Sequence, residues 1–166
     1  SRHRAVIAYT ILNINISLWI FLGLLRTSEF FSDKISLILI LYRINWSLTG
    51  FLFLNFIYAF LKIRNKILYW VSFLCMAAGF YIINLTDIAF NGNLIETVYG
   101  MREIYSDSVF KVVILNSGIP ITAALFLLTD FIFRKSPRKV FPEIMILNCA
   151  AIGYIFILYF DVLLPG

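Results

Sequence analysis

Charge is scarce in this sequence. Lys and Arg number 14 and Asp and Glu 9 among 166 residues, so charged residues make up only 14% of the chain. An ordinary soluble domain carries about 25% charged residues. Because polar side chains must cover the core of a soluble protein, this scarcity excludes a water-soluble globular domain.

Histidine and cysteine are nearly absent. The one histidine is His3, in the leading basic segment, which excludes a histidine-based triad and a multi-histidine metal site. There is no HExxH, CxxC, Walker or GxGxxG motif, and no apolar run holds a pair of carboxylates. We therefore expect no catalytic site, metal site or cofactor within this chain. Cys75 and Cys149 lie far apart in apolar runs, which predicts core packing.

Glycine and proline are also few, at 8 and 4 residues. These counts exclude collagen and low-complexity disorder. No heptad repeat and no repeat of about 20–50 residues is present, which excludes a coiled coil and a solenoid.

Apolar residues, by contrast, are abundant and make up 61% of the sequence. The mean hydropathy of the chain is +0.91. A helix needs about 20 apolar residues to cross the hydrocarbon layer of a membrane. Five segments meet this requirement: 5–25, 35–61, 67–88, 109–133 and 140–162. We predict an all-α, polytopic transmembrane bundle, with residues 1–166 forming a single domain and short links joining antiparallel neighbours.

The basic residues predict the orientation of these spans. Nine of the fourteen fall on one side: Arg2, Arg4, Lys62, Arg64, Lys66, Arg134, Lys135, Arg138 and Lys139. Basic residues near span ends are retained in the cytoplasm. Most acidic residues fall on the other side: Glu29, Asp33, Asp87, Glu96, Glu103, Asp107 and Asp161. We expect a multi-pass protein of the inner (plasma) membrane, with residue 1 cytoplasmic and residue 166 outside.

The same distribution bears on partners. A pI near 9.3 can indicate a nucleic-acid surface. Here, however, the positive charges are divided among short loops without interleaved aromatic residues. We expect no nucleic acid and predict membrane lipids, with anionic headgroups at the basic loops, as partners.

Polar residues within the spans divide into two groups. Most, such as the pairs Asn13/Ser17 and Asn45/Thr49, are expected to hold helices together, and the Ala77-Ala78-Gly79 segment suits close packing. Arg43 is different because it lies roughly 12 Å into the second span. Charged side chains at such depth usually face a bundle interior or a wet cavity, although Arg43 could also extend to the outer headgroups.

In the first of these interpretations, Arg43 belongs to a ligand-binding pocket open to the outside. Its predicted members are Arg43, Tyr42, Trp46, Asn84, Asp87 and Asn116, with Asp87 or Glu96 as counter-charge. The pocket would take a small-molecule, lipophilic or protein signal.

Two nearby segments carry further expectations. The sequence Asn116-Ser117-Gly118-Ile119-Pro120 predicts a kink, which serves either packing or signalling. The outer loop 91–108 has apolar residues at helical spacing, so it is either a short amphipathic helix that acts as a lid or a solvated connector.

Several short motifs of this sequence form a further pattern. They are Asn15 and Trp19 in the first span, the run Leu41-Tyr42-Arg43-Ile44-Asn45-Trp46 that leads to residues 51–56, Gly153, and the ending Asp161-Val162-Leu163-Leu164-Pro165-Gly166. With these motifs, the sequence resembles the N-terminal seven-transmembrane sensor region of bacterial histidine kinases and some diguanylate cyclases. It covers the second to sixth helices of the family's seven. The missing initiator Met and the abrupt end also suggest a piece of a longer protein.

The resemblance implies a receptor of a two-component system. It implies a sensory input module, a homodimer, and a cytoplasmic output domain, such as a histidine kinase domain, that follows a further helix. Two alternatives of other classes stay open, namely a small transporter or channel subunit, and a structural membrane protein without ligand.

Overall fold

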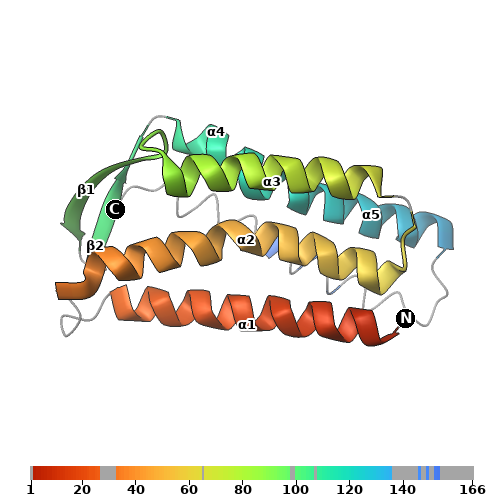
Figure 1. Ribbon diagram of the computed structural model, residues 1–166. Helices are drawn as coiled ribbons and strands as arrows, with labels where there is room; N and C mark the ends of the chain where they lie inside the picture. The colour runs from red at the N-terminus through yellow and green to blue at the C-terminus, as the bar shows by residue number, and fades with distance from the viewer. Residues whose placement is uncertain are drawn as a thin grey trace.

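The computed structural model describes residues 2–26, 33–64, 66–97, 100–106 and 108–135, together with residues 146, 149, 152 and 153 (Figure 1). Three helices come first: α1 (Arg2–Arg26), α2 (Ile35–Leu61) and α3 (Ile67–Leu85). Two strands follow, β1 (Phe90–Thr97) and β2 (Gly100–Tyr105). The next elements of the described residues are α4 (Val109–Val113), the π-helical turn η2 (Ile114–Gly118) and α5 (Ile119–Lys135).

Within the described residues, four helical segments are long and apolar enough to cross a membrane, namely His3–Arg26, Ile35–Leu61, Ile67–Leu85 and Val109–Phe131. They correspond to four of the five predicted spans. The third helix ends at Leu85 rather than residue 88, because the backbone at Thr86 is extended. Of the fifth predicted span, 140–162, the structure describes only residues 146, 149, 152 and 153, which are helical, and the rest of this span lies outside the described residues.

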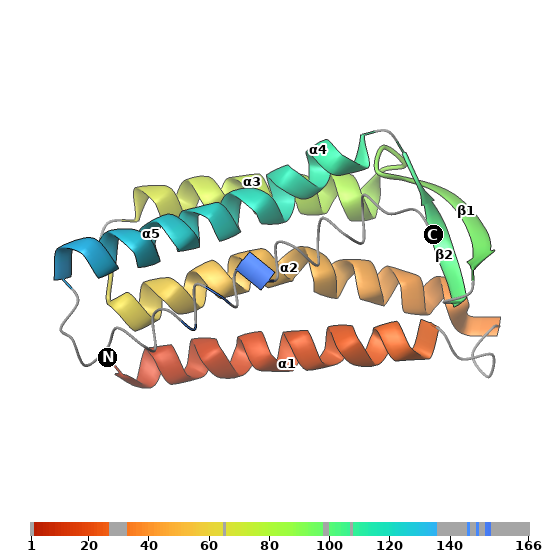
Figure 2. The ribbon, with the colours of Figure 1, turned by 180° about the vertical axis from the view of Figure 1, so that it is seen from behind.

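Consecutive long helices run antiparallel (Figures 1 and 2). As a result, the starts of α1 and α3 and the ends of α2 and α5 lie at one end of the bundle. We call this the basic end, since Arg4, Lys62, Arg64 and Lys66 are all exposed there. The two strands lie at the opposite end, which we call the hairpin end.

A tight turn joins α2 to α3 at the basic end. Lys62 adopts a left-handed conformation with φ 55°, and its backbone N–H donates to the carbonyl oxygen of Tyr58. The N–H of Ile63 donates to the same oxygen at 3.2 Å. This pattern satisfies a helix C-terminus, so α3 can return directly against α2.

Two apolar clusters form the core. The cluster nearer the basic end contains Leu54, Ile57 and Leu128, and the cluster nearer the hairpin end contains Trp46 and Ile83 with residues of α4 and α5. Many large apolar side chains instead point outward: Ile14, Leu24, Leu74, Leu85 and Phe126 are each more than half exposed. Such an outer surface suits lipid rather than water.

The segment after α3 corrects one expectation. The short amphipathic helix considered for residues 91–108 is wrong, because β1 and β2 form an antiparallel hairpin whose ladder ends at the pair Thr97 and Gly100. Asn91, Gly92 and Asn93 disfavour helix, and the pairing register is irregular between Phe90 and Leu94, where these residues lie. β-Branched residues such as Ile95 then favour strand.

Two hydrogen bonds join the segments that precede β1 and follow β2. Ser106 N–H donates to the carbonyl oxygen of Ala89 at 3.1 Å, and the Ser106 hydroxyl donates to that of Ile88. These bonds close the base of the hairpin, which supports a two-stranded unit that is marginal by itself.

The cysteines depart from the packing prediction at one position. Cys75 is partly buried, as packing requires, but Cys149 is exposed. Both thiols are free.

The antiparallel arrangement predicts that Arg64 and Asp87 lie on opposite sides of a membrane. In a background with Cys75→Ala and Cys149→Ala, we expect Arg64→Cys and Asp87→Cys to react with a membrane-impermeant thiol reagent from opposite sides. Labelling of intact and opened cells measures this. Labelling of both positions from the same side would contradict the transmembrane assignment of α3.

Candidate functional site

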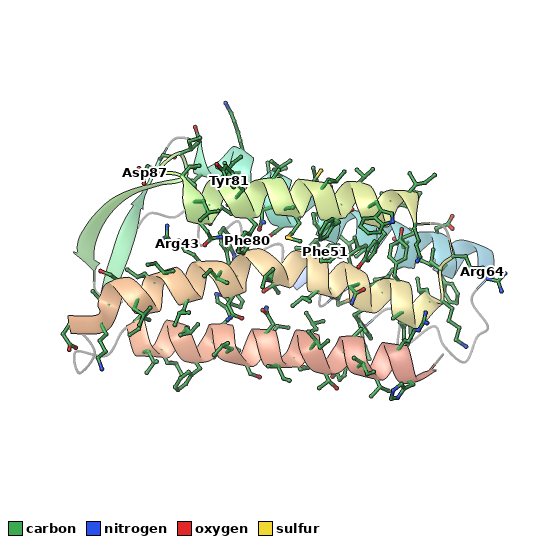
Figure 3. The ribbon with its side chains drawn as sticks, viewed as in Figure 1. Arg43, Phe51, Arg64, Phe80, Tyr81 and Asp87 are labelled. Carbon is green, nitrogen blue, oxygen red and sulfur yellow. The ribbon has the colours of Figure 1, made fainter. Side chains whose placement is uncertain are left out.

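Arg43 lies in α2 and extends toward α3 (Figure 3). Its Nη1 donates to the backbone carbonyl oxygen of Ile83 at 3.4 Å, and its side chain is partly buried. The bond joins a cation to the last part of a neighbouring apolar helix. Arg43 therefore faces the α2/α3 interface, as expected for charged residues within a span.

Asn84 and Trp46 surround this contact. Asn84 Nδ2 donates to Ser47 Oγ at 3.3 Å and to the carbonyl oxygen of Phe80 at 3.0 Å. Ser47 is fully buried and donates its own hydroxyl to the carbonyl oxygen of Arg43 at 2.7 Å. Trp46 is buried and packs in the same apolar cluster as Ile83. Arg43, Trp46 and Asn84 thus belong to one site, with Ser47 as a member that was not predicted as a ligand residue.

The side-chain oxygen of Asn84 stands out in this site. Asn84 Oδ1 is buried and accepts no hydrogen bond from the part of the chain that the structure describes. An unpaired buried carbonyl oxygen costs about 1–3 kcal/mol. Such atoms are suited to accept a hydrogen bond from water or from a ligand donor.

Tyr42 faces another helix. Its ring lies 6.1 Å from the ring of Trp19 and 5.1 Å from the guanidinium carbon of Arg26, both on α1. Adjacent helical residues differ in direction by about 100°. Tyr42 and Arg43 therefore serve different interfaces, Tyr42 toward α1 and Arg43 toward α3.

Asp87 and Asn116 lie at either side of the site. Asp87 is exposed beyond the end of α3, at the hairpin end of the bundle (Figure 3). Asn116 is fully buried in η2, where Nδ2 donates to the carbonyl oxygen of Met76 at 3.1 Å. Met76 precedes Asn84 by about two turns of α3. Glu96, the other proposed counter-charge, lies in β1.

The turn η2 is wedged between two glycines. An added Cβ at Gly79 of α3 would lie 2.5 Å from Asn116 Cβ and 2.8 Å from its Cα. An added Cβ at Gly50 of α2 would lie 3.0 Å from Ser117 Cα. The absence of side chains at these two positions lets three helices approach at backbone distance, as small residues do in membrane bundles.

Pro120 gives a local reason for the π-helical turn. Proline has no N–H to bond the carbonyl four residues before it, and its ring clashes with that carbonyl, which here belongs to Asn116. The widened turn ends with the Ile119 N–H bonded to the Ile114 carbonyl oxygen, an i to i+5 bond. The segment 116–120, where the sequence predicts a kink, overlaps this π turn, and η2 connects α4 and α5 as parts of one span.

Other polar residues hold helices together as predicted. Asn15 Nδ2 donates to Thr49 Oγ1 at 2.7 Å and to the carbonyl oxygen of Asn45 at 3.2 Å, which joins α1 to α2. Asn13 does not take part, since it is exposed and its Nδ2 bonds the carbonyl oxygen of Tyr9 in its own helix.

A cleft at the basic end was not anticipated. It has a volume of about 480 Å³ and is lined by α1, α2 and the start of α3, including Arg4, Asn55, Lys66 and Tyr69. An apolar groove of about 460 Å³ lies elsewhere, beside η2, and includes Ile114, Gly118 and Phe126. No sequence spacing signals the cleft, because its walls come from three separate helices.

A metal site needs several ligand side chains that lie close together. Within the described ranges, no group of three or more His, Cys, Asp or Glu side chains is placed to hold a metal ion.

In comparisons with known proteins, no family model, curated protein or solved structure matches the chain. The resemblance to histidine-kinase sensor regions therefore stays a prediction.

The contact between Gly79 and Asn116 predicts a sharp response to one methyl group. We expect Gly79→Ala to lower the free energy of unfolding by about 1–3 kcal/mol, because the new Cβ meets backbone atoms that must move. Gly23→Ala is the matched control, since its Cβ would lie 3.6 Å from the ring of Tyr42, an ordinary contact. Unfolding in detergent micelles measures both, and equal effects would contradict the close approach at η2.

Proposed function

We propose that this chain is the membrane-embedded sensory input module of a bacterial signalling receptor of the histidine-kinase type. The observation that carries the proposal is the polar site between α2 and α3. There the Arg43 guanidinium lies in the same interface as Asn84, whose Oδ1 has no partner among the residues that the structure describes. A cationic donor and a buried acceptor can together recognise a polar group of a small or lipophilic signal.

The position of η2 suits this function. Asn84 and Gly79 lie on the same helix, and Gly79 contacts Asn116 of η2 directly. A shift of α3 upon signal binding would therefore act on the π turn. A π turn interrupts regular helix bonding and often occurs at functional sites. The change would then pass along α5 to the basic end.

The transmission needs two arrangements of the bundle. A signal shifts their balance only if it binds one arrangement more tightly than the other. In our proposal, the receptor is a homodimer in the inner membrane, with residue 1 cytoplasmic and residue 166 outside. A following helix returns the chain to a cytoplasmic output domain.

Charge reversal at Arg43 tests the proposal in the full-length gene product, assembled in membranes. We expect Arg43→Glu to abolish the change of kinase or cyclase output with signal, and Asn84→Leu to lower signal sensitivity about 5–150-fold, the range of typical coupling energies. Arg64→Glu, an exposed change of the same charge, is the matched control.

Each outcome of this test discriminates between function classes. Lost signalling with normal membrane assembly supports the sensor. Loss of solute flux at Arg43→Glu would instead assign a transporter or channel subunit, whose pathway includes this residue. An unchanged output would exclude a role of Arg43 in sensing and would favour a structural membrane protein.

A further inference from the structure

The cleft at the basic end combines two kinds of lining. Arg4 from the first turn of α1 and Lys66 just before α3 bring two cations from segments that are far apart in sequence. Ile7, Ile11 and Ile63 supply apolar walls. None of the described residues that line the cleft is acidic.

Polar and aromatic groups complete the lining. The hydroxyl of Tyr69 donates to Asn55 Oδ1 at 3.3 Å, and both residues line the cleft. The rings of Tyr58 and Trp70 lie 5.2 and 5.8 Å from that of Tyr69. Trp70 is also 54% exposed, a position typical of an aromatic residue at a membrane interface.

We infer that this cleft binds an anionic phospholipid, with the phosphate between Arg4 and Lys66 and the upper part of the acyl chains against the isoleucines. The charge of the lining complements a phosphate, and its two-sided polarity matches an amphiphile. Its volume of about 480 Å³ falls within the range of ligand sites, about 300–1,000 Å³. Basic pockets between transmembrane helices recognise lipid headgroups through the same chemistry. The inference does not depend on the sensory function proposed above.

The test measures lipid retention by the purified chain in detergent, by native mass spectrometry with phosphatidylglycerol and phosphatidylcholine. We expect the unchanged protein to retain phosphatidylglycerol preferentially. Arg4→Gln with Lys66→Gln should weaken that binding about 25-fold, at about fivefold for each cation removed. Arg4→Lys with Lys66→Arg should keep it.

The matched control removes two neighbouring cations outside the cleft. Lys62→Gln with Arg64→Gln makes the same change of net charge at the same end of the bundle. This control should keep the preference for phosphatidylglycerol. An equal loss in both double variants would overturn the proposal, because it would indicate diffuse surface charge rather than a site.

Two further results would also overturn it. Effective competition by inorganic phosphate would assign the cleft to a free anion, and no preference for phosphatidylglycerol in the unchanged protein would exclude an anionic lipid site. If the double variant Arg4→Gln with Lys66→Gln fails to fold, the two single variants provide the same comparison. Each should weaken the binding of phosphatidylglycerol about fivefold.

Discussion

The arrangement of this bundle depends on the close approach of three helices around η2. Gly50 and Gly79 bring the backbones of α2 and α3 against Ser117 and Asn116. Lipid tails are as apolar as the side chains, so no hydrophobic effect drives the helices together. The helices associate mainly through packing and hydrogen bonds. At this junction both operate at once: Asn116 bonds the carbonyl oxygen of Met76, and its own Oδ1 accepts the hydroxyl of Ser117.

Polar side chains on either side of the junction also form hydrogen bonds between helices. Asn15 bonds Thr49 between α1 and α2, and Asn84 bonds Ser47 between α2 and α3. Each of these bonds links helices at a fixed height, because an amide without a partner is costly inside hydrocarbon. The polar side chains therefore set the register of helices whose apolar surfaces would tolerate sliding. Arg43, with its bond to Ile83, belongs to this framework as well as to the proposed signal site.

The sequence predicts the long helices well because their signal is local. An apolar run bounded by charges defines α2 without knowledge of its neighbours, and Arg43 is conspicuous by its depth alone.

The hairpin and the cleft at the basic end could not be predicted from the sequence, for two different reasons. Pairing of β1 with β2 depends on partners across a turn, whereas the apolar spacing at 91–108 also suits a helix. The cleft depends on Arg4 and Lys66, which come from segments far apart in the sequence, lining the same space. Tyr42 and Arg43 are neighbours in sequence, but the twist of the helix turns them toward different partners.

The π turn also changes how the last described span is to be drawn. A π turn holds one residue more than an α turn, so the side chains that follow are rotated by roughly 100° relative to a continuous α-helix. A regular helical wheel through the span would therefore draw Ala123, Ala124 and Leu128, which are all buried, rotated by that angle relative to α4. The π turn at 114–118 also separates two parts of the span that contribute to different regions of the core: α4 packs in one core cluster, and the later part of α5 packs in the other.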